Sequence, residues 1–247
     1  MKLYYAGAEN NLKLFKKLNI DSLLMAYPFI KKKSLKIDRN WFIDCGAYSA
    51  YTKKLKINID EYLMFIFKNN LKIYASLDVI GNAELSYKNY LYMKKKKARR
   101  QIPAFHYGED VKYLKLYLEE CDYIAIGGVA QLKSNQNKLK KFLDSCYNEI
   151  AKKKKVKVHG YGLNNWKLLL KYPFYSVDAT SWLNPNIYGQ HFKFEQGKLK
   201  RISNDKKIIN KFYKNEDRLI ASLKEFKKAE KYLTKLWEKR GVIWKHR

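Results

Sequence analysis

The chain has 247 residues, and its 52 Lys and Arg against 23 Asp and Glu give a net charge of +29 at pH 7. With 47% hydrophobic and 15% aromatic residues it has enough apolar material for a sizeable core, which excludes disorder of the weakly hydrophobic kind. The longest apolar stretch, residues 22–30, is far shorter than the roughly 20 residues of a membrane helix, so we expect a cytoplasmic protein that does not contact membranes.

Short β-branched or aromatic segments alternate with segments of helical periodicity up to about residue 190. Strands are expected at residues 3–6, 22–27, 41–45, 73–77, 102–106, 123–126, 156–159 and 175–177, and helices at 11–18, 58–68, 83–95, 110–119, 137–151 and 164–171. This alternation indicates a parallel sheet with right-handed crossovers, and eight strands is the number that closes a barrel. We therefore expect an α/β protein with a (β/α)8 TIM-type barrel over residues 1–190, with a doubly wound open sheet as the alternative.

The pattern changes after residue 190. A hairpin is expected around residues 191–202, followed by a long helix over about 205–239. The apolar positions of that helix recur every three or four residues, which predicts that one face packs on the barrel; they are Leu219, Leu223, Phe226, Leu233 and Trp237. Residues 191–247 carry 18 Lys and Arg against 7 Asp and Glu, so this basic C-terminal extension is a favoured contributor to the binding of any polyanion.

Polar residues follow most of the predicted strands, and the carboxyl ends of barrel strands are where catalytic side chains converge. Asp44, Asp78 and Asp178 follow the third, fourth and eighth strands. Carboxylates gathered in this way can hold a metal, act as an acid/base pair, or combine a nucleophile with an acid/base partner. No HxH or HExxH motif occurs, and Cys45, Cys121 and Cys146 form no CxxC motif, so we expect neither a metal site nor a disulfide framework. Glycoside chemistry suits the set best.

Other residues at the strand ends are suited to a flat ligand. Gly127 and Gly128 would let backbone N–H groups approach a base closely, although a tight turn is the plainer interpretation. Tyr48 and His159 offer flat faces between which a purine could stack, or they belong to ordinary packing. The runs at residues 94–100 and 152–155 precede strands, so we expect them on the opposite face of the barrel as solvated surface.

In the order of these motifs the chain resembles the tRNA-guanine transglycosylase superfamily, over about residues 40–182. The motifs are Phe42-Ile-Asp44-Cys-Gly-Ala-Tyr48, Ser76-Leu-Asp78, Phe105-His106-Tyr-Gly, Ile126-Gly127-Gly128-Val-Ala, His159-Gly-Tyr-Gly and Ser176-Val-Asp178. The resemblance implies a (β/α)8 barrel that exchanges guanine for a 7-deazapurine without a cofactor. It implies the following roles: Asp178 as nucleophile, Asp44 as acid/base, Tyr48 stacking on the base, and Asp78, His106, Gly127, Gly128 and His159 around it.

The chain departs from the family's bacterial tRNA enzymes in lacking a Cys/His zinc subdomain, and His106 and His159 stand where Gln and Met are usual. It is therefore more similar to the DNA branch of the superfamily, found in phages and genomic islands, which inserts 7-deazaguanine derivatives into DNA. We expect DNA rather than tRNA as partner, with a free preQ0-like base as second substrate. A tRNA enzyme, a hydrolytic glycosylase and a non-catalytic nucleic-acid-binding barrel are the alternatives.

Overall fold

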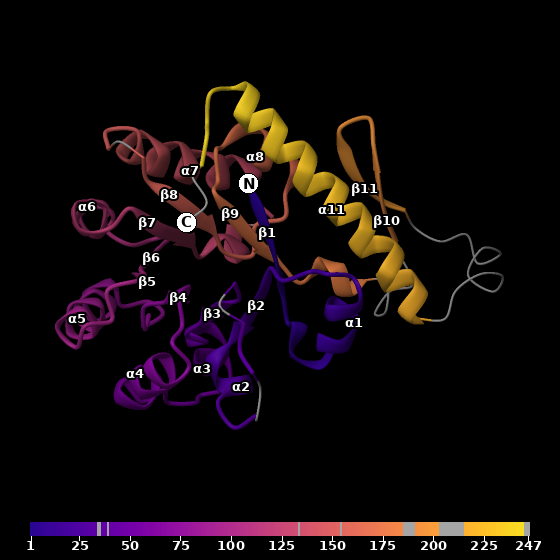
Figure 1. Cartoon of the computed structure of the whole chain (residues 1–247). Helices are drawn as coiled ribbons and strands as arrows, with labels where there is room; N and C mark the ends of the chain where they lie inside the picture. The colour runs from indigo at the N-terminus through magenta and orange to yellow at the C-terminus, as the bar shows by residue number, and fades with distance from the viewer. Residues whose placement is uncertain are drawn as a thin grey trace.

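In a computed structural model of the protein, nine parallel strands form a barrel-shaped sheet surrounded by helices (Figure 1). The structure describes residues 1–33, 36–38, 40–132, 134–153, 155–184, 191–202 and 215–244. The strands follow one another around the barrel in the order β5-β4-β3-β2-β1-β9-β8-β7-β6. Their bounds are β1 Lys2–Ala6, β2 Leu23–Ala26, β3 Phe42–Asp44, β4 Tyr74–Ala75, β5 Gln101–Ile102, β6 Ala104–His106, β7 Tyr123–Gly127, β8 Lys157–Gly160 and β9 Ser176–Ala179. The expected α/β barrel is confirmed.

Pro103 explains why nine strands are found where eight were expected. It divides the predicted strand 102–106 into β5, which pairs with β4, and β6, which pairs with β7. Proline has no N–H group to donate, but its carbonyl oxygen still accepts a hydrogen bond from the Ala125 N–H at 2.8 Å. On the other side, the carbonyl of Ile102 accepts from the Ser76 N–H at 3.0 Å. One short segment therefore joins the two ends of the sheet and brings the barrel to closure.

Helices cover the outside of the barrel, and most begin at a side chain that caps them. Asn58, Asn82, Asp110, Asn135 and Asn165 each accept a hydrogen bond from a backbone N–H in the first turn of the helix that follows. The helices are α1 Leu12–Lys17, α2 Tyr27–Ile30, α3 Ala47–Thr52, α4 Ile59–Lys68, α5 Ala83–Lys95, α6 Val111–Glu120, α7 Gln136–Ile150 and α8 Trp166–Lys171, with short 3-10 turns η1 Ala8–Asn10, η2 Val129–Leu132 and η3 Ser181–Leu183.

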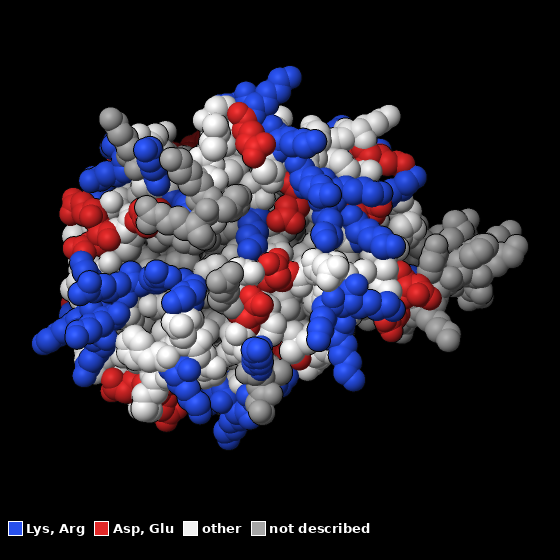
Figure 2. All heavy atoms as spheres, in the orientation of Figure 1, with Lys and Arg blue, Asp and Glu red and all other residues white. Residues whose placement is uncertain are grey.

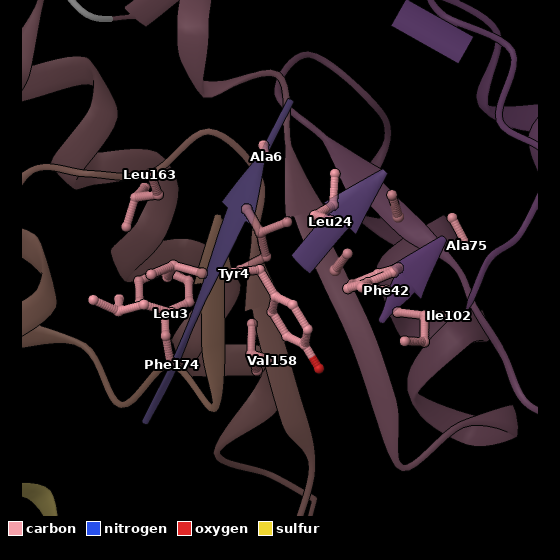
Figure 3. Packing of buried hydrophobic residues seen from close by; sticks show 14 of the residues in the cluster. Leu3, Tyr4, Ala6, Leu24, Phe42, Ala75, Ile102, Val158, Leu163 and Phe174 are labelled. Carbon is pink, nitrogen blue, oxygen red and sulfur yellow. The ribbon is translucent and has the colours of Figure 1, made fainter. Parts of the chain in front are cut away.

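Successive residues of each strand point alternately into the barrel and toward the helices. On β1, Leu3 and Tyr4 lie on opposite sides of the strand (Figure 3). Tyr4 and Phe42 meet inside the barrel with ring centroids 5.6 Å apart in an edge-to-face arrangement. The strands read as nearly continuous apolar runs because both of their faces are buried.

The C-terminal extension packs on the barrel beside β1. The hairpin β10 His191–Glu195 and β11 Lys198–Ile202 is present as expected, and helix α11 Asn215–Lys239 crosses the front of the molecule in Figure 1. The expected start of this helix, residues 205–214, lies outside the described residues. The five apolar positions named above for this helix are all buried. The Glu230 carboxylate also accepts a hydrogen bond from the Leu3 N–H at 3.1 Å. The extension is therefore joined to the barrel core.

Basic side chains spread over the face of the molecule shown in Figure 2, with one group beside α5 and another along α11. Acidic residues are interspersed among them, so the surface is basic on balance without being uniformly so. Within the part of the chain that the structure describes, no helix is long and apolar enough to cross a membrane.

Candidate active site at the carboxyl ends of the barrel strands

Asp178 lies on β9 with both of its hydrogen bonds at one carboxylate oxygen. The Gly162 N–H donates to Oδ1 at 2.9 Å, and Nε2 of His159 lies 3.2 Å from the same oxygen. His159 comes from the neighbouring strand β8, where it pairs with Ser176, two residues before Asp178. Since residues two apart on a strand face the same side, Ser176 and Asp178 both point into the barrel.

Asp44 ends strand β3, near Asp178. Its Oδ2 accepts a hydrogen bond from the Gly46 N–H at 3.1 Å. Burial and, to a lesser extent, the negative charge of Asp178 raise the pKa of Asp44 to about 6, although hydrogen bonds from backbone N–H groups and the charge of His106 oppose this rise. A carboxyl group with a pKa close to neutrality can both release and take up a proton under ordinary conditions, which is what acid/base catalysis requires.

Asp78, His106 and Glu109 form a second cluster beside Asp44. Nε2 of His106 lies 3.9 Å from Oδ2 of Asp78, and Nδ1 lies 3.4 Å from Oε1 of Glu109. The other oxygen of Glu109 accepts from the His106 backbone N–H at 2.8 Å. Glu109 therefore holds both the backbone and the ring of His106.

The charges of this cluster perturb one another strongly. Burial raises the pKa of Asp78 to about 7; the charges of Asp44 and Glu109 also raise it, while His106 lowers it. Burial by itself would lower the pKa of His106, but the hydrogen bond to Glu109 and the charges of Asp78, Glu109 and Asp44 raise it above its usual value. The cluster therefore places an imidazole between two carboxyl groups, a set of donors and acceptors suited to the polar edge of a base.

Gly127 ends β7 and Gly128 follows it, directly against His106 and Tyr107. A β-carbon at Gly127 would stand 2.5 Å from Cδ2 of His106, and Gly128 has a φ of +72° that favours glycine. A β-carbon at Gly128 would stand 2.7 Å from the Tyr107 nitrogen. Close packing therefore accounts for both glycines, and their expected role as N–H donors to a base stays a prediction.

The two residues expected to stack on a base lie in opposite environments. Tyr48, on α3, is 66% exposed and is free to meet a ligand; its stacking role stays a prediction. The expectation that His159 offers a face to the base is wrong for this structure. Its ring is fully buried, and its centroid lies 4.7 Å from that of Phe42 and 4.6 Å from that of Tyr161, with Tyr4 at 6.0 Å. His159 therefore contacts Asp178 and presents no exposed face to a ligand.

The structure thus brings Asp44, Asp78, His106 and Asp178 together at the carboxyl ends of β3, β4, β6 and β9, as the sequence predicted. It adds Glu109, Ser176 and the Gly162 N–H, which the sequence analysis missed. Glu109 was detectable as a carboxylate three residues after His106, and Ser176 as the polar residue two before Asp178. Among the described residues, no group of three His, Cys, Asp or Glu side chains is placed to hold a metal ion.

Two carboxylates with different surroundings, the buried Asp178 and the half-buried Asp44, can divide the work of breaking a glycosidic bond. One oxygen of Asp178 accepts two hydrogen bonds, and Asp44 has a raised pKa and hydrogen bonds from backbone N–H groups. Such a difference in environment is how two carboxyls of one site take the separate roles of nucleophile and proton carrier. Comparison with protein-family models and a search of curated proteins both give no match to the chain.

Proposed function

We propose that the protein is a base-exchange transglycosylase that replaces guanine in a polynucleotide with a free 7-deazaguanine such as preQ0. The observation that carries the proposal is the pair of unlike carboxylates, Asp178 and Asp44, whose charges interact at one end of the barrel. The order of motifs described above supports the same chemistry. The net charge of +29 supports a nucleic-acid substrate, because basic side chains displace the counterions of a phosphate backbone.

The first half of the reaction removes the guanine. The Asp178 carboxylate attacks C1′ of the nucleotide and forms a C1′–O bond while the C1′–N9 bond breaks. The electron pair of that bond leaves with the guanine, which takes up the proton that Asp44 carries. Protonated Asp44 lowers the barrier because a neutral base leaves more readily than an anion.

The second half returns the enzyme to its starting state. The incoming 7-deazaguanine gives its N9 proton to the Asp44 carboxylate, and its nitrogen attacks C1′. The bond between C1′ and Asp178 then breaks, which restores the Asp178 carboxylate and leaves Asp44 protonated for the next cycle. Asp78 and His106, held by Glu109, would contact the polar edge of the base in both halves.

DNA is the polymer we favour over tRNA, because the chain lacks the Cys/His zinc subdomain of the bacterial tRNA enzymes that it resembles. In duplex DNA the target nucleotide must be flipped out of the stack at a cost of a few kcal/mol, so unpaired DNA should react faster. The exposed Tyr48 lies four residues after Asp44, on the helix that follows β3, and would stack on such a base.

The test is uptake of radiolabelled guanine or preQ0 into DNA and, in parallel, into unmodified tRNA. Asp178→Asn should abolish uptake, and Asp144→Asn is the matched control because Asp144 is an exposed residue paired with Lys171 on the outside of the barrel. Label in DNA that depends on Asp178 would establish both reaction and polymer. Label in tRNA alone would keep the reaction and overturn the polymer, and release of guanine without uptake would identify a hydrolytic glycosylase.

A further inference from the structure

A continuous chain of hydrogen bonds runs through the barrel interior from Tyr123 to Asp178. The Tyr123 hydroxyl lies 2.7 Å from Oγ of Ser176, and that oxygen lies 2.7 Å from Nδ1 of His159. The opposite ring nitrogen, Nε2, lies 3.2 Å from Oδ1 of Asp178. Three strands contribute to the chain, because Tyr123 begins β7, His159 lies on β8, and Ser176 and Asp178 lie on β9.

The interior of this chain is sealed from solvent. Ser176 and His159 are both 0% exposed. Tyr123 lies at the amino end of its strand and borders a hollow that Arg99 and Arg100 also line, at the end of the barrel opposite to the site. The chain therefore crosses the barrel, and its inner members are shielded from bulk solvent.

The chemistry of the groups sets the direction of the chain. A carboxylate can only accept hydrogen bonds, so an ionised Asp178 requires the proton of a neutral His159 to be on Nε2. Nδ1 then has a lone pair and accepts from the Ser176 hydroxyl. Ser176 in turn accepts from Tyr123, and burial raises the pKa of Tyr123, which keeps that hydroxyl protonated.

Both donors that reach Asp178 end on the same oxygen. The His159 Nε2–H and the Gly162 N–H converge on Oδ1, and among the described residues no hydrogen bond reaches Oδ2. The carboxylate is therefore held at one oxygen, which leaves the other oxygen available to a substrate.

We propose that Tyr123, Ser176 and His159 form a positioning chain that fixes the His159 tautomer and, through it, holds Asp178 as an ionised nucleophile with Oδ2 toward the substrate. The proposal rests on the function proposed above, because it names the residues that position the proposed nucleophile. None of the three residues touches the reacting atoms. Their effect is to hold one rotamer of Asp178 before the substrate arrives.

Other groups also lie near His159 and Asp178. Asp44 on β3 carries the charge that interacts with Asp178. Tyr161 follows β8. Burial keeps the pKa of its hydroxyl well above the usual value, and the charges of Asp44 and Asp178 also raise it. The rings of Tyr4 and Phe42 close the remaining sides of the imidazole.

The tautomer can be measured without any activity. The chain has 4 histidines, so two-bond 1H–15N correlation spectra of 15N-histidine-labelled full-length protein resolve each ring, and the signals lost in His159→Gln identify His159. We expect the Nε2–H tautomer in the wild-type protein at pH 7. An Nδ1–H tautomer or a doubly protonated ring would overturn the proposal.

Single-turnover release of guanine from DNA measures the effect on the reaction. His159→Leu removes the donor and should slow release about 100-fold, whereas His159→Gln keeps an N–H within reach of Oδ1 and should recover at least about tenfold of that loss. Ser176→Ala should slow release about tenfold with unchanged affinity for DNA. Equal rates for the Leu and Gln variants would contradict the proposal.

Matched controls separate positioning from general damage to the core. Ser222→Ala removes another fully buried serine hydroxyl, on α11, and Tyr147→Phe removes a buried phenol oxygen without a hydrogen-bond partner among the described residues. Both controls should release guanine at the wild-type rate, while Ser176→Ala and Tyr123→Phe should not. If the wild-type protein releases no guanine, the proposed function fails, and the tautomer of His159 with and without the Ser176 hydroxyl still decides whether the chain orients the ring.

Discussion

The imidazole of His106 packs so closely on Gly127 that a β-carbon on this glycine would stand 2.5 Å from Cδ2 of the ring. Glu109 contacts Nδ1 at the other edge of the same ring and also accepts a hydrogen bond from the His106 backbone N–H. His106 is thus confined between a glycine backbone and a carboxylate, and its Nε2 is directed toward Asp78. This confinement is what the base-contacting part of the site depends on.

Gly127→Ala should therefore displace His106 and destabilise the protein by about 1–3 kcal/mol, the usual cost of overpacking. The same substitution in a His106→Ala background should cost little, since the ring that clashes is gone. Chemical denaturation of the four proteins in this cycle measures the coupling. Equal costs of Gly127→Ala in both backgrounds would show that the contact is not responsible.

The raised pKa of Asp78 makes the stability of the protein depend on pH. Its carboxyl has a pKa of about 7 in the folded protein against a usual value of 3.8, so between about pH 4 and 7 the folded state binds more protons than the unfolded state. The stability that protonated Asp78 provides is complete below about pH 4 and is lost as the pH rises through 7. Replacing the carboxyl with an amide removes this dependence.

Asp78→Asn should accordingly gain stability relative to the wild-type protein between pH 4 and pH 8, by at most about 4 kcal/mol. Thermal or denaturant unfolding at the two pH values measures the difference. The control is Asp144→Asn, because hydrogen bonds from Lys171 and Tyr172 lower the pKa of Asp144 and its replacement should bring no such gain. A pH-independent difference for Asp78→Asn would refute this assignment.

Asp44 should control the pH dependence of the first half-reaction. Guanine departure needs its protonated form, so the single-turnover rate of guanine release should fall as the pH rises through about 6. Asp44→Asn should slow release about 100- to 10,000-fold and abolish this dependence on pH. Rapid-quench measurements between pH 5 and 8 test both statements, and a variant that retains the wild-type pH profile would exclude Asp44 as the proton donor.

Tyr48 should contribute to binding without contributing to stability, because two thirds of its surface is exposed. Loss of a stacking aromatic costs about 1–3 kcal/mol per base, so Tyr48→Ala should weaken the binding of the base or of single-stranded DNA roughly 5- to 150-fold. Tyr51→Ala is the matched control, since Tyr51 lies on the same helix and is equally exposed. Fluorescence titration and melting temperatures separate the two effects; equal losses in both variants would argue for a general surface effect instead of a specific stack.

The C-terminal helix should be necessary for folding, not only for charge. Leu223 is fully buried against the barrel, so Leu223→Ala should destabilise the protein by about 2–5 kcal/mol. Tyr232→Ala, at a 37% exposed position of the same helix, should cost less. Denaturant unfolding compares the two. A chain that unfolds at the same denaturant concentration with and without the Leu223 side chain would show that α11 is an independent appendage.

The architecture was predictable from the sequence because local patterns carry it. The run 123–126 is apolar throughout and 156–159 is rich in β-branched residues, as expected of buried strands, and helices of amphipathic periodicity separate such runs. Pro103 was also visible in the sequence, but its effect on strand pairing was not. Whether a proline ends a strand or lets it change partners depends on which strands lie on either side of it.

The positions of the carboxylates at one end of the barrel followed from the same logic. Asp44, Asp78 and Asp178 each follow or end a parallel strand, and the carboxyl ends of such strands meet on one face whatever the details of packing. Chain order and strand period thus determined the fold and the shared end of the barrel for these three aspartates, and composition determined the basic character of the protein.

Only the tertiary structure decided what each of those residues does. His159 looked like a ligand contact, yet its ring is enclosed by Phe42 and Tyr161 and bonded to Ser176 and Asp178. The close packing of the His106 ring on Gly127 was likewise not visible in the sequence. Burial, hydrogen-bond partners and pKa arise from groups that are distant in sequence and adjacent in space, and no local pattern encodes that adjacency.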